Sequence, residues 1–283
     1  MSHPTQELVR WLTKTPQDLR RVARLLREIE TTEKGPLDDV QRIEKMVSEL
    51  QKLIAGLAKW GDVITELNQW VEDYRARLED RKRELKRGFG ARLEALLKEQ
   101  GFELKGLYPE LKAGFYTIEV NFDRWQATIW YGPKQELMDR CKLSASMVAK
   151  HLELVHKDLT GRPIDEEAFL KKLHDAYLRA LSRLGRKEGE QAPILQVLSE
   201  YVFLNQDKRF YTDPRKEHFK GYGRAHFSYD LFRLKQRRLL GWELSLVVAT
   251  RANTISRERF LWVPTDEKGD GTAFAYLQFR EVR

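Results

Sequence analysis

The sequence has a single cysteine and no long apolar run, and both absences exclude classes of protein. Cys141 alone cannot form an internal disulfide or build a zinc site of the cysteine type. No stretch of about eighteen apolar residues is present, and residues 1–10 lack the apolar core of a signal peptide. We therefore expect no membrane insertion and no secretion, and the cytoplasm is the expected compartment.

Motifs for catalysis and nucleotide binding are also missing. There is no GxxxxGKS or GxxxxGKT phosphate loop, no GxGxxG, no GxSxG, no HExxH and no paired CxxC. His151 and His156 are five residues apart, which places them on different faces of a helix. Cys141 stands between Arg140 and Lys142, which could lower its pKa, although a packing role is commoner. We expect no catalytic residue, no metal and no cofactor.

Apolar residues return in alternating steps of three and four between residues 37 and 97, which is the signature of a coiled coil. The phase survives Gly56 and Gly61, so we interpret the segment as one long helix rather than a hairpin. Such a helix must bury its seam against the chain's first helix, a second copy or another protein. The seam consists of Val40, Ile43, Val47, Leu50, Ile54, Leu57, Trp60, Ile64, Leu67, Val71, Tyr74 and Leu78.

The period changes after residue 101. Alternating apolar residues predict a β-hairpin over 116–122 and 125–131, and further strands over 242–250, 259–263 and 272–282. Helical spacing predicts helices over 144–159, 165–184 and from Asp213 onward, whereas 193–204 fits either structure. The predicted fold class is α+β. A helical coiled-coil assembly region, 1–100, would precede a basic domain, 101–283, with several helices and one sheet of about five mainly antiparallel strands.

Positive charge is concentrated near the C-terminus. The formal net charge of the chain is +8. Residues 208–238 hold ten basic and three acidic residues, an excess of seven that nearly equals the whole net charge. The basic residues of this segment are Lys208, Arg209, Arg215, Lys216, Lys220, Arg224, Arg233, Lys235, Arg237 and Arg238.

The same segment is rich in aromatic residues, and it supports three interpretations. Cations that bind phosphate next to rings that stack on bases are typical of nucleic-acid surfaces. Phe219, Tyr222, His226 and Tyr229 are spaced three and four apart, so they could instead form the core face of a helix. An acidic protein partner is the third interpretation. The run that contains Arg233, Lys235, Arg237 and Arg238 has no acid, so these four residues are the expected phosphate contacts.

The sequence favours a non-enzymatic nucleic-acid-binding subunit, with DNA favoured over RNA, that joins a homo-oligomer or hetero-complex through its coiled coil. A protein-interaction scaffold is the first alternative. By analogy of architecture only, it would be an accessory subunit of a chromosome-maintenance or phage-defence complex. The second alternative is a metal-dependent nuclease with Glu119, Asp123 and Glu243 as magnesium ligands. Leu244 and Ser245 follow Glu243, so the lysine that restriction-type nucleases carry two residues after that acid is missing.

Overall fold

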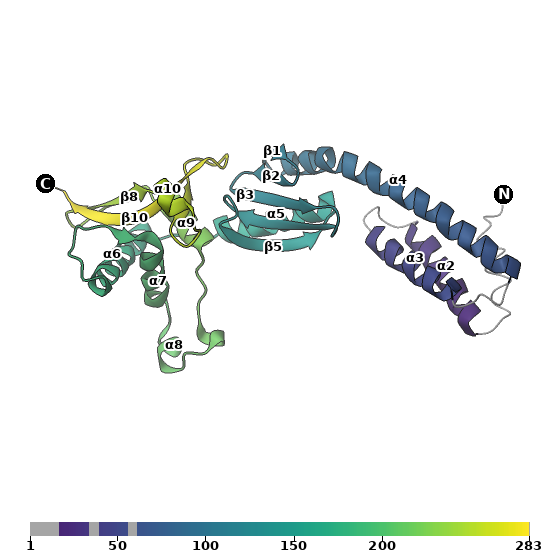
Figure 1. The fold of residues 1–283 in the computed structure, drawn as a ribbon. Coiled ribbons are helices and arrows are strands. Elements are labelled where there is room, and N and C mark those ends of the chain that lie inside the picture. Colours follow the sequence, from purple (N-terminus) through teal and green to yellow (C-terminus); the bar gives the residue numbers. More distant parts are fainter. Residues whose placement is uncertain (1–16, 34–39, 56–60, 283) are drawn as a thin grey trace. The chain divides into compact units, whose positions relative to one another are not determined.

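A computed structural model describes residues 17–33, 40–55 and 61–282 of the chain (Figure 1). The fold is mixed α and β, as predicted, and all strand pairs are antiparallel. The chain divides into two compact units, 1–93 with 143–145, and 94–142 with 146–283. The division therefore falls between Leu93 and Glu94. The boundary predicted from the sequence was after residue 100.

The described residues of the first unit form three helices, and neighbouring helices are antiparallel. Arg21 pairs with Glu49 at 2.6 Å, and Lys82 pairs with Glu44 at 2.7 Å. In one straight helix, residues 44 and 82 would be roughly 57 Å apart at 1.5 Å per residue. The prediction of one continuous helix is therefore wrong. The helices are α2 (Gln17–Glu33), α3 (Val40–Ala55) and α4 (Gly61–Glu99).

The apolar seam lies in the core of this helical unit. Nine of its members are at most 5% exposed in the single chain: Val40, Ile43, Val47, Leu50, Ile54, Leu67, Val71, Tyr74 and Leu78. Ile64 is half-buried, and Leu57 and Trp60 lie outside the described residues. Burial, together with the Glu33 carboxylate of α2, raises the pKa of Tyr74 to about 12. The buried part of the seam therefore needs no second chain to cover it. The heptad spacing continues from α3 into α4 because both helices turn their apolar faces toward the same core.

The second unit contains two sheets. The first is a meander in which each strand pairs with the next, in the order β1-β2-β3-β4-β5. Helix α5 (Ala145–Thr160) packs on it, because His151 of α5 contacts Asp139 at 2.6 Å and His156 contacts the hydroxyl of Tyr116 at 3.2 Å. The strands are β1 (Leu104–Leu107), β2 (Glu110–Ala113), β3 (Tyr116–Asn121), β4 (Gln126–Tyr131) and β5 (Glu136–Lys142).

The second sheet has the order β6-β10-β8-β7, and β9 pairs with β10. Its strands are β6 (Ala192–Pro193), β7 (Arg238–Leu239), β8 (Trp242–Val248), β9 (Leu261–Pro264) and β10 (Gly271–Glu281). Three helices share one apolar core with it: α6 (Glu166–Arg183), α7 (Ile194–Leu204) and α9 (Arg224–Arg233). The short helices are α8 (Lys208–Thr212), the 3-10 helix η3 (Lys216–His218) and α10 (Arg251–Thr254).

Three features of the predicted β domain need correction or completion. The predicted single sheet is wrong, because the hairpin and the C-terminal strands belong to different sheets. Strands β1, β2 and β5 were not predicted, because β1 and β2 have only four residues each and β5 lacks apolar alternation. The helix predicted from Asp213 onward is wrong, because only the short 3-10 helix η3 follows that residue before α9. The segment 193–204, for which the sequence allowed either structure, is helical over 194–204.

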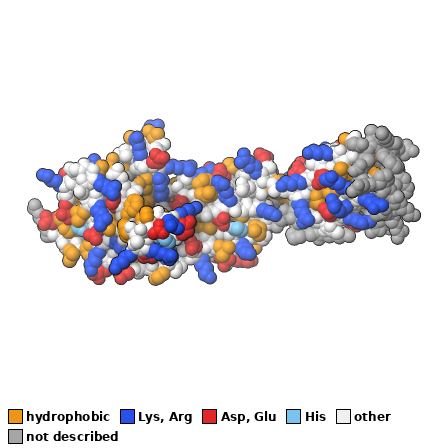
Figure 2. All heavy atoms as spheres, turned by 90° about the horizontal axis from the view of Figure 1, so that it is seen from below, with side chains coloured by type: hydrophobic (Ala, Val, Ile, Leu, Met, Phe, Trp, Pro, Cys, Tyr) orange, Lys and Arg blue, Asp and Glu red, His pale blue; other side chains and the backbone are white. Residues whose placement is uncertain are grey.

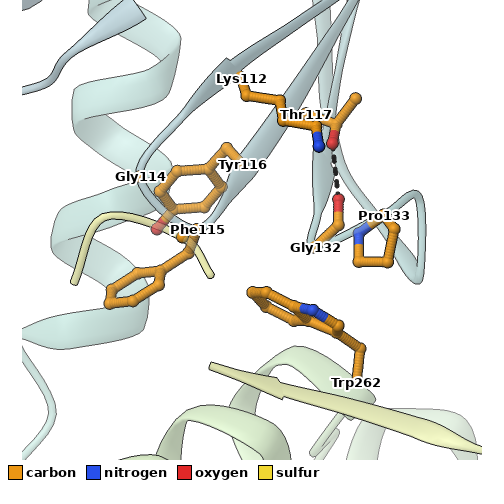
Figure 3. Close-up of a pocket in the computed structure, with 9 residues that line it drawn as sticks. Lys112, Gly114, Phe115, Tyr116, Thr117, Gly132, Pro133 and Trp262 are labelled. Atoms are coloured by element: carbon orange, nitrogen blue, oxygen red, sulfur yellow. Dashed lines mark hydrogen bonds between the residues drawn. The ribbon is translucent and has the colours of Figure 1, made fainter. Parts of the chain in front are cut away.

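Trp262 joins the two sheets (Figure 3). Its ring lies against Gly132, where an added Cβ would come within 2.6 Å of the indole. The side chain of Gln135 hydrogen-bonds both the N–H and the carbonyl of Trp262, and Ser228 of α9 donates to that carbonyl at 2.6 Å. The cavity beside the ring is only about 70 Å³, whereas small-molecule pockets are about 300–1,000 Å³. This site is a packing contact between the sheets.

Candidate nucleic-acid interface

The basic segment predicted from the sequence is divided into three parts by the structure. Residues 207–220, here called the arm, leave α7 and return to α9, with α8 at the far end (Figure 1). Arg224 and Arg233 belong to α9. Lys235 and Arg237 lie in the exposed connection after α9, and Arg238 is the first residue of β7. The ten basic residues therefore belong to three different segments of the fold.

The arm is closed at its base by one side chain. The Gln206 amide accepts a hydrogen bond from the Lys220 N–H at 2.8 Å and donates to the Lys220 carbonyl at 3.0 Å. Lys220 also pairs with Asp207 at 2.8 Å. Gln206 is only 8% exposed, so this contact is shielded from water. The two ends of the arm are thereby held together.

Three aromatic rings are exposed on and beside the arm. Tyr211 is 60% exposed, Phe203 45% and Phe219 42%. The Tyr211 hydroxyl donates to the Phe203 carbonyl, and Phe219 lies 5.6 Å from Phe210, centroid to centroid. We call Phe203, Tyr211 and Phe219 the aromatic cluster. Exposed rings held in place by neighbours can stack on bases without further ordering.

The arm carries five basic and three acidic residues. Arg215 and Lys220 pair with acids of the arm, but such exposed pairs contribute little. Lys208, Arg209 and Lys216 have no acidic partner within 4.0 Å among the described residues. Figure 2 looks onto this side of the chain, where hydrophobic side chains lie among basic and acidic ones.

Arg233 does not extend toward solvent. It pairs with the buried Asp230 at 2.7 Å and donates to the Arg162 carbonyl at 2.6 Å, and its side chain is 17% exposed. Arg162 pairs with the same carboxylate at 3.1 Å, and the Tyr222 hydroxyl donates to it at 2.6 Å. Burial and the Asp230 charge raise the pKa of Tyr222, so its hydroxyl stays a donor. Arg233 is thus part of a buried ion-pair network, contrary to its expected role as an exposed phosphate contact.

This network lies in a cleft of about 390 Å³ between α6, the end of α7, the return of the arm and α9. Lys172 of α6 also lines the cleft, and it donates to Asn205 at 2.6 Å. We call this site the arginine cleft. It is lined by Arg162, Pro163, Ile164, Asp165, Ala168, Phe169, Lys172, Tyr201, Asn205, Lys220, Gly221, Tyr222, Asp230 and Arg233.

The remaining predicted residues lie outside the arm, in α9, in the connection that follows it and in β7. Lys235 and Arg237 are exposed, and the Glu166 carboxylate accepts from the Lys235 N–H at 3.0 Å. Arg238 pairs with Glu243 at 3.2 Å. Arg224 donates to the carbonyl of Arg257 at 2.6 Å.

The chemistry considered for an enzyme is not assembled in the described part of the chain. Glu119 binds Trp130 and Lys134, and these bonds lower its pKa. No group of three or more His, Cys, Asp or Glu side chains among residues 17–33, 40–55 and 61–282 could hold a metal. Burial and Asp139 raise the pKa of Cys141 to about 11, so its neighbouring cations do not activate the thiol. No described helix is long and apolar enough to cross a membrane.

Sequence reasoning missed Phe203, Arg162 and Lys172, because all three lie outside residues 208–238. Phe203 belongs to an apolar helix and Lys172 to an amphipathic one, and neither position has a local signal of exposure or pairing. Asp230, three residues before Arg233, was a usable signal for an ion pair. Comparison with protein-family models, curated proteins and solved structures gave no match to this chain.

Proposed function

We propose that the second unit is a non-enzymatic module that binds single-stranded nucleic acid through the arm. The observation that supports this is the aromatic cluster, exposed beside the basic residues of the arm. A ring platform next to cations suits a strand whose bases are unpaired, because the bases stack while the phosphates meet Lys and Arg. The cluster is equally open to DNA and RNA. The proposal makes no use of assembly through α3 and α4, because most of the seam that suggested it is buried within the chain.

The salt dependence of binding tests the electrostatic part. For single strands, log K falls by about 0.7 per phosphate contact per log unit of salt. Five arm cations that all contact phosphate would give a slope near −3.5 on this scale. We expect Lys208→Gln to reduce the slope by about 0.7. Lys187→Gln removes an exposed charge from the loop after α6 and should leave the slope unchanged.

The aromatic part is tested by Tyr211→Ala, with fluorescence anisotropy on labelled single-stranded and duplex DNA and on single-stranded RNA. Stacking is worth about 1–3 kcal/mol per base, so affinity for single strands should fall about 5- to 150-fold. Leu240→Ala removes an 87% exposed apolar side chain elsewhere and is the control. An equal loss of affinity for single strands in Tyr211→Ala and Leu240→Ala would contradict the proposal, and so would tighter binding to duplex than to single strands. If the protein does not bind nucleic acid even at low salt, the arm would be assigned instead to an acidic protein partner.

A further inference from the structure

The arginine cleft carries positive charge that its own acids do not balance. Its lining has four basic residues, Arg162, Lys172, Lys220 and Arg233, against the two acids Asp165 and Asp230, and Lys220 also pairs with Asp207 outside the lining. Asp230 is shared by both arginines, so one carboxylate serves two guanidinium groups. Within the described part of the chain, Lys172 bonds to a neutral amide, that of Asn205, and to no acid. With the Lys220 charge balanced by Asp207, three cations face two acids and the cleft has an excess of one positive charge.

This excess lies in a partly desolvated place. The side chains of Arg162 and Arg233 are 30% and 17% exposed, and the Nε atom of each is buried with no partner among the described residues. Uncompensated charge in such a site costs free energy unless an anion neutralises it. A phosphate monoester carries a charge of about −1.5 to −2 at neutral pH, which is enough to neutralise this excess, and its oxygens accept hydrogen bonds from Arg and Lys side chains.

The size and the remaining walls of the cleft indicate what the phosphate is attached to. Phe169, Tyr201 and Tyr222 supply aromatic surface beside the cations. A volume of about 390 Å³ lies at the lower end of the range for small-molecule sites. We propose that the arginine cleft binds the phosphate monoester of a single nucleotide. The ligand is either a free nucleoside monophosphate or the 5′-phosphorylated end of a strand, and the site would act whether or not the arm binds nucleic acid.

Lys172 and Lys171 provide a matched pair of variants on one helix. Lys172 is half-buried in the cleft, whereas Lys171 is exposed and pairs with Glu167 at 2.5 Å. Calorimetric titration with adenosine 5′-monophosphate and with adenosine measures the contribution of the phosphate. We expect the nucleotide to bind at least tenfold tighter than the nucleoside, Lys172→Gln to abolish that difference and Lys171→Gln to keep it. Arg162→Gln, checked for folding by thermal melting, should act like Lys172→Gln.

Competition by oligonucleotides separates the two sources of the monoester. If a 5′-phosphorylated oligonucleotide displaces the nucleotide and its 5′-hydroxyl counterpart does not, the site takes strand ends. If neither displaces it, the site takes free nucleotides. Equal affinity for nucleotide and nucleoside, or equal losses in both lysine variants, would overturn the inference. Binding of the 5′-hydroxyl strand to the Lys172→Gln protein reports on the arm alone, so failure of the cleft and failure of the arm give different results.

Discussion

The side-chain amide of Gln206 makes two hydrogen bonds to the backbone of Lys220, as a neighbouring strand would. The two positions are fourteen apart in the sequence, and no strand of the sheet supports the arm between them. This side chain, together with the ion pair between Lys220 and Asp207, therefore replaces the backbone pairing that would otherwise close the loop. A third bond, from Gln206 to the Val202 carbonyl at 2.8 Å, anchors the same amide to α7.

Gln206→Ala should loosen the arm without unfolding the unit. Hydrogen bonds contribute about 0.5–1.5 kcal/mol each, so loss of this group should cost about 1–2 kcal/mol locally. We expect faster amide hydrogen exchange in residues 207–220 and weaker binding to single strands. Gln236→Ala removes an exposed amide whose only described bond is a long one of 3.4 Å, and it should change neither quantity. Unaltered exchange in the arm of Gln206→Ala would show that other contacts close it.

Glu136 of β5 caps helix α9 from outside the helix. Its carboxylate accepts from the Ala225 N–H at 2.6 Å, at the first turn, where the helix dipole also favours a negative charge. Gly223 leaves the necessary space, because an added Cβ would lie 2.1 Å from a Glu136 oxygen. We expect Glu136→Ala and Gly223→Ala each to cost about 1 kcal/mol in urea unfolding, and the double variant to cost little more than one of them. Gly221→Ala meets no atom within 4 Å and is the control. If the two losses of unfolding free energy simply add in the double variant, Gly223 is not required to make room for the Glu136 carboxylate.

The strands with clear apolar alternation were predictable. The hairpin predicted over 116–122 and 125–131 is β3 and β4, and the three C-terminal strands were also placed correctly. Their pairing was not predictable, because alternation identifies a buried face but not which sheet the strand joins. The same limit applies to α3 and α4, where a hairpin and a rod share one apolar phase.

For the candidate site, the sequence predicted a segment rich in basic and aromatic residues but not which of these side chains are exposed. The spacing of Phe219, Tyr222 and His226 fits a helix, yet α9 starts at Arg224, so Phe219 is in the arm while Tyr222 meets Asp230. Spacing alone could not separate an exposed ring from a buried one. Likewise, the sequence shows the charge of Arg233 but not where its side chain points. That depends on the tertiary fold, which brings Arg162 and Asp230 together beside it.

Asp230 should be among the most sensitive positions of the second unit. It is 4% exposed and binds Arg162, Arg233 and Tyr222, so its removal leaves two guanidinium groups without their counter-ion. We expect Asp230→Ala to lower the free energy of unfolding by about 3–5 kcal/mol, measured in urea. Asp158→Ala removes a 78% exposed carboxylate and should change stability by about 0.5 kcal/mol or less. Similar values for the two variants would mean that the network contributes little.

We expect two half-buried histidines to make the stability of the fold depend on pH near neutrality. Burial lowers the pKa of His156 and of His226 from the ordinary value of 6.5. Glu267 opposes the shift at His156, and Glu136, Asp158 and Asp230 oppose it at His226, where Arg162 adds to it. The unfolded chain therefore binds more protons than the folded chain as the pH falls through 6.5, and folding loses stability.

We expect the midpoint of urea unfolding to be lower at pH 5.5 than at pH 7.5. Carboxylates and lysines keep their charges in this window, because their ordinary pKa values lie near 4 and above 10. A variant with both His156→Gln and His226→Gln cannot gain these protons, so its midpoint should change less between the two values. His218→Gln keeps both half-buried imidazoles and should retain the decline. If the double variant declines as steeply as the wild type, protonation elsewhere causes the loss, and the two imidazoles are accommodated as cations in the folded chain.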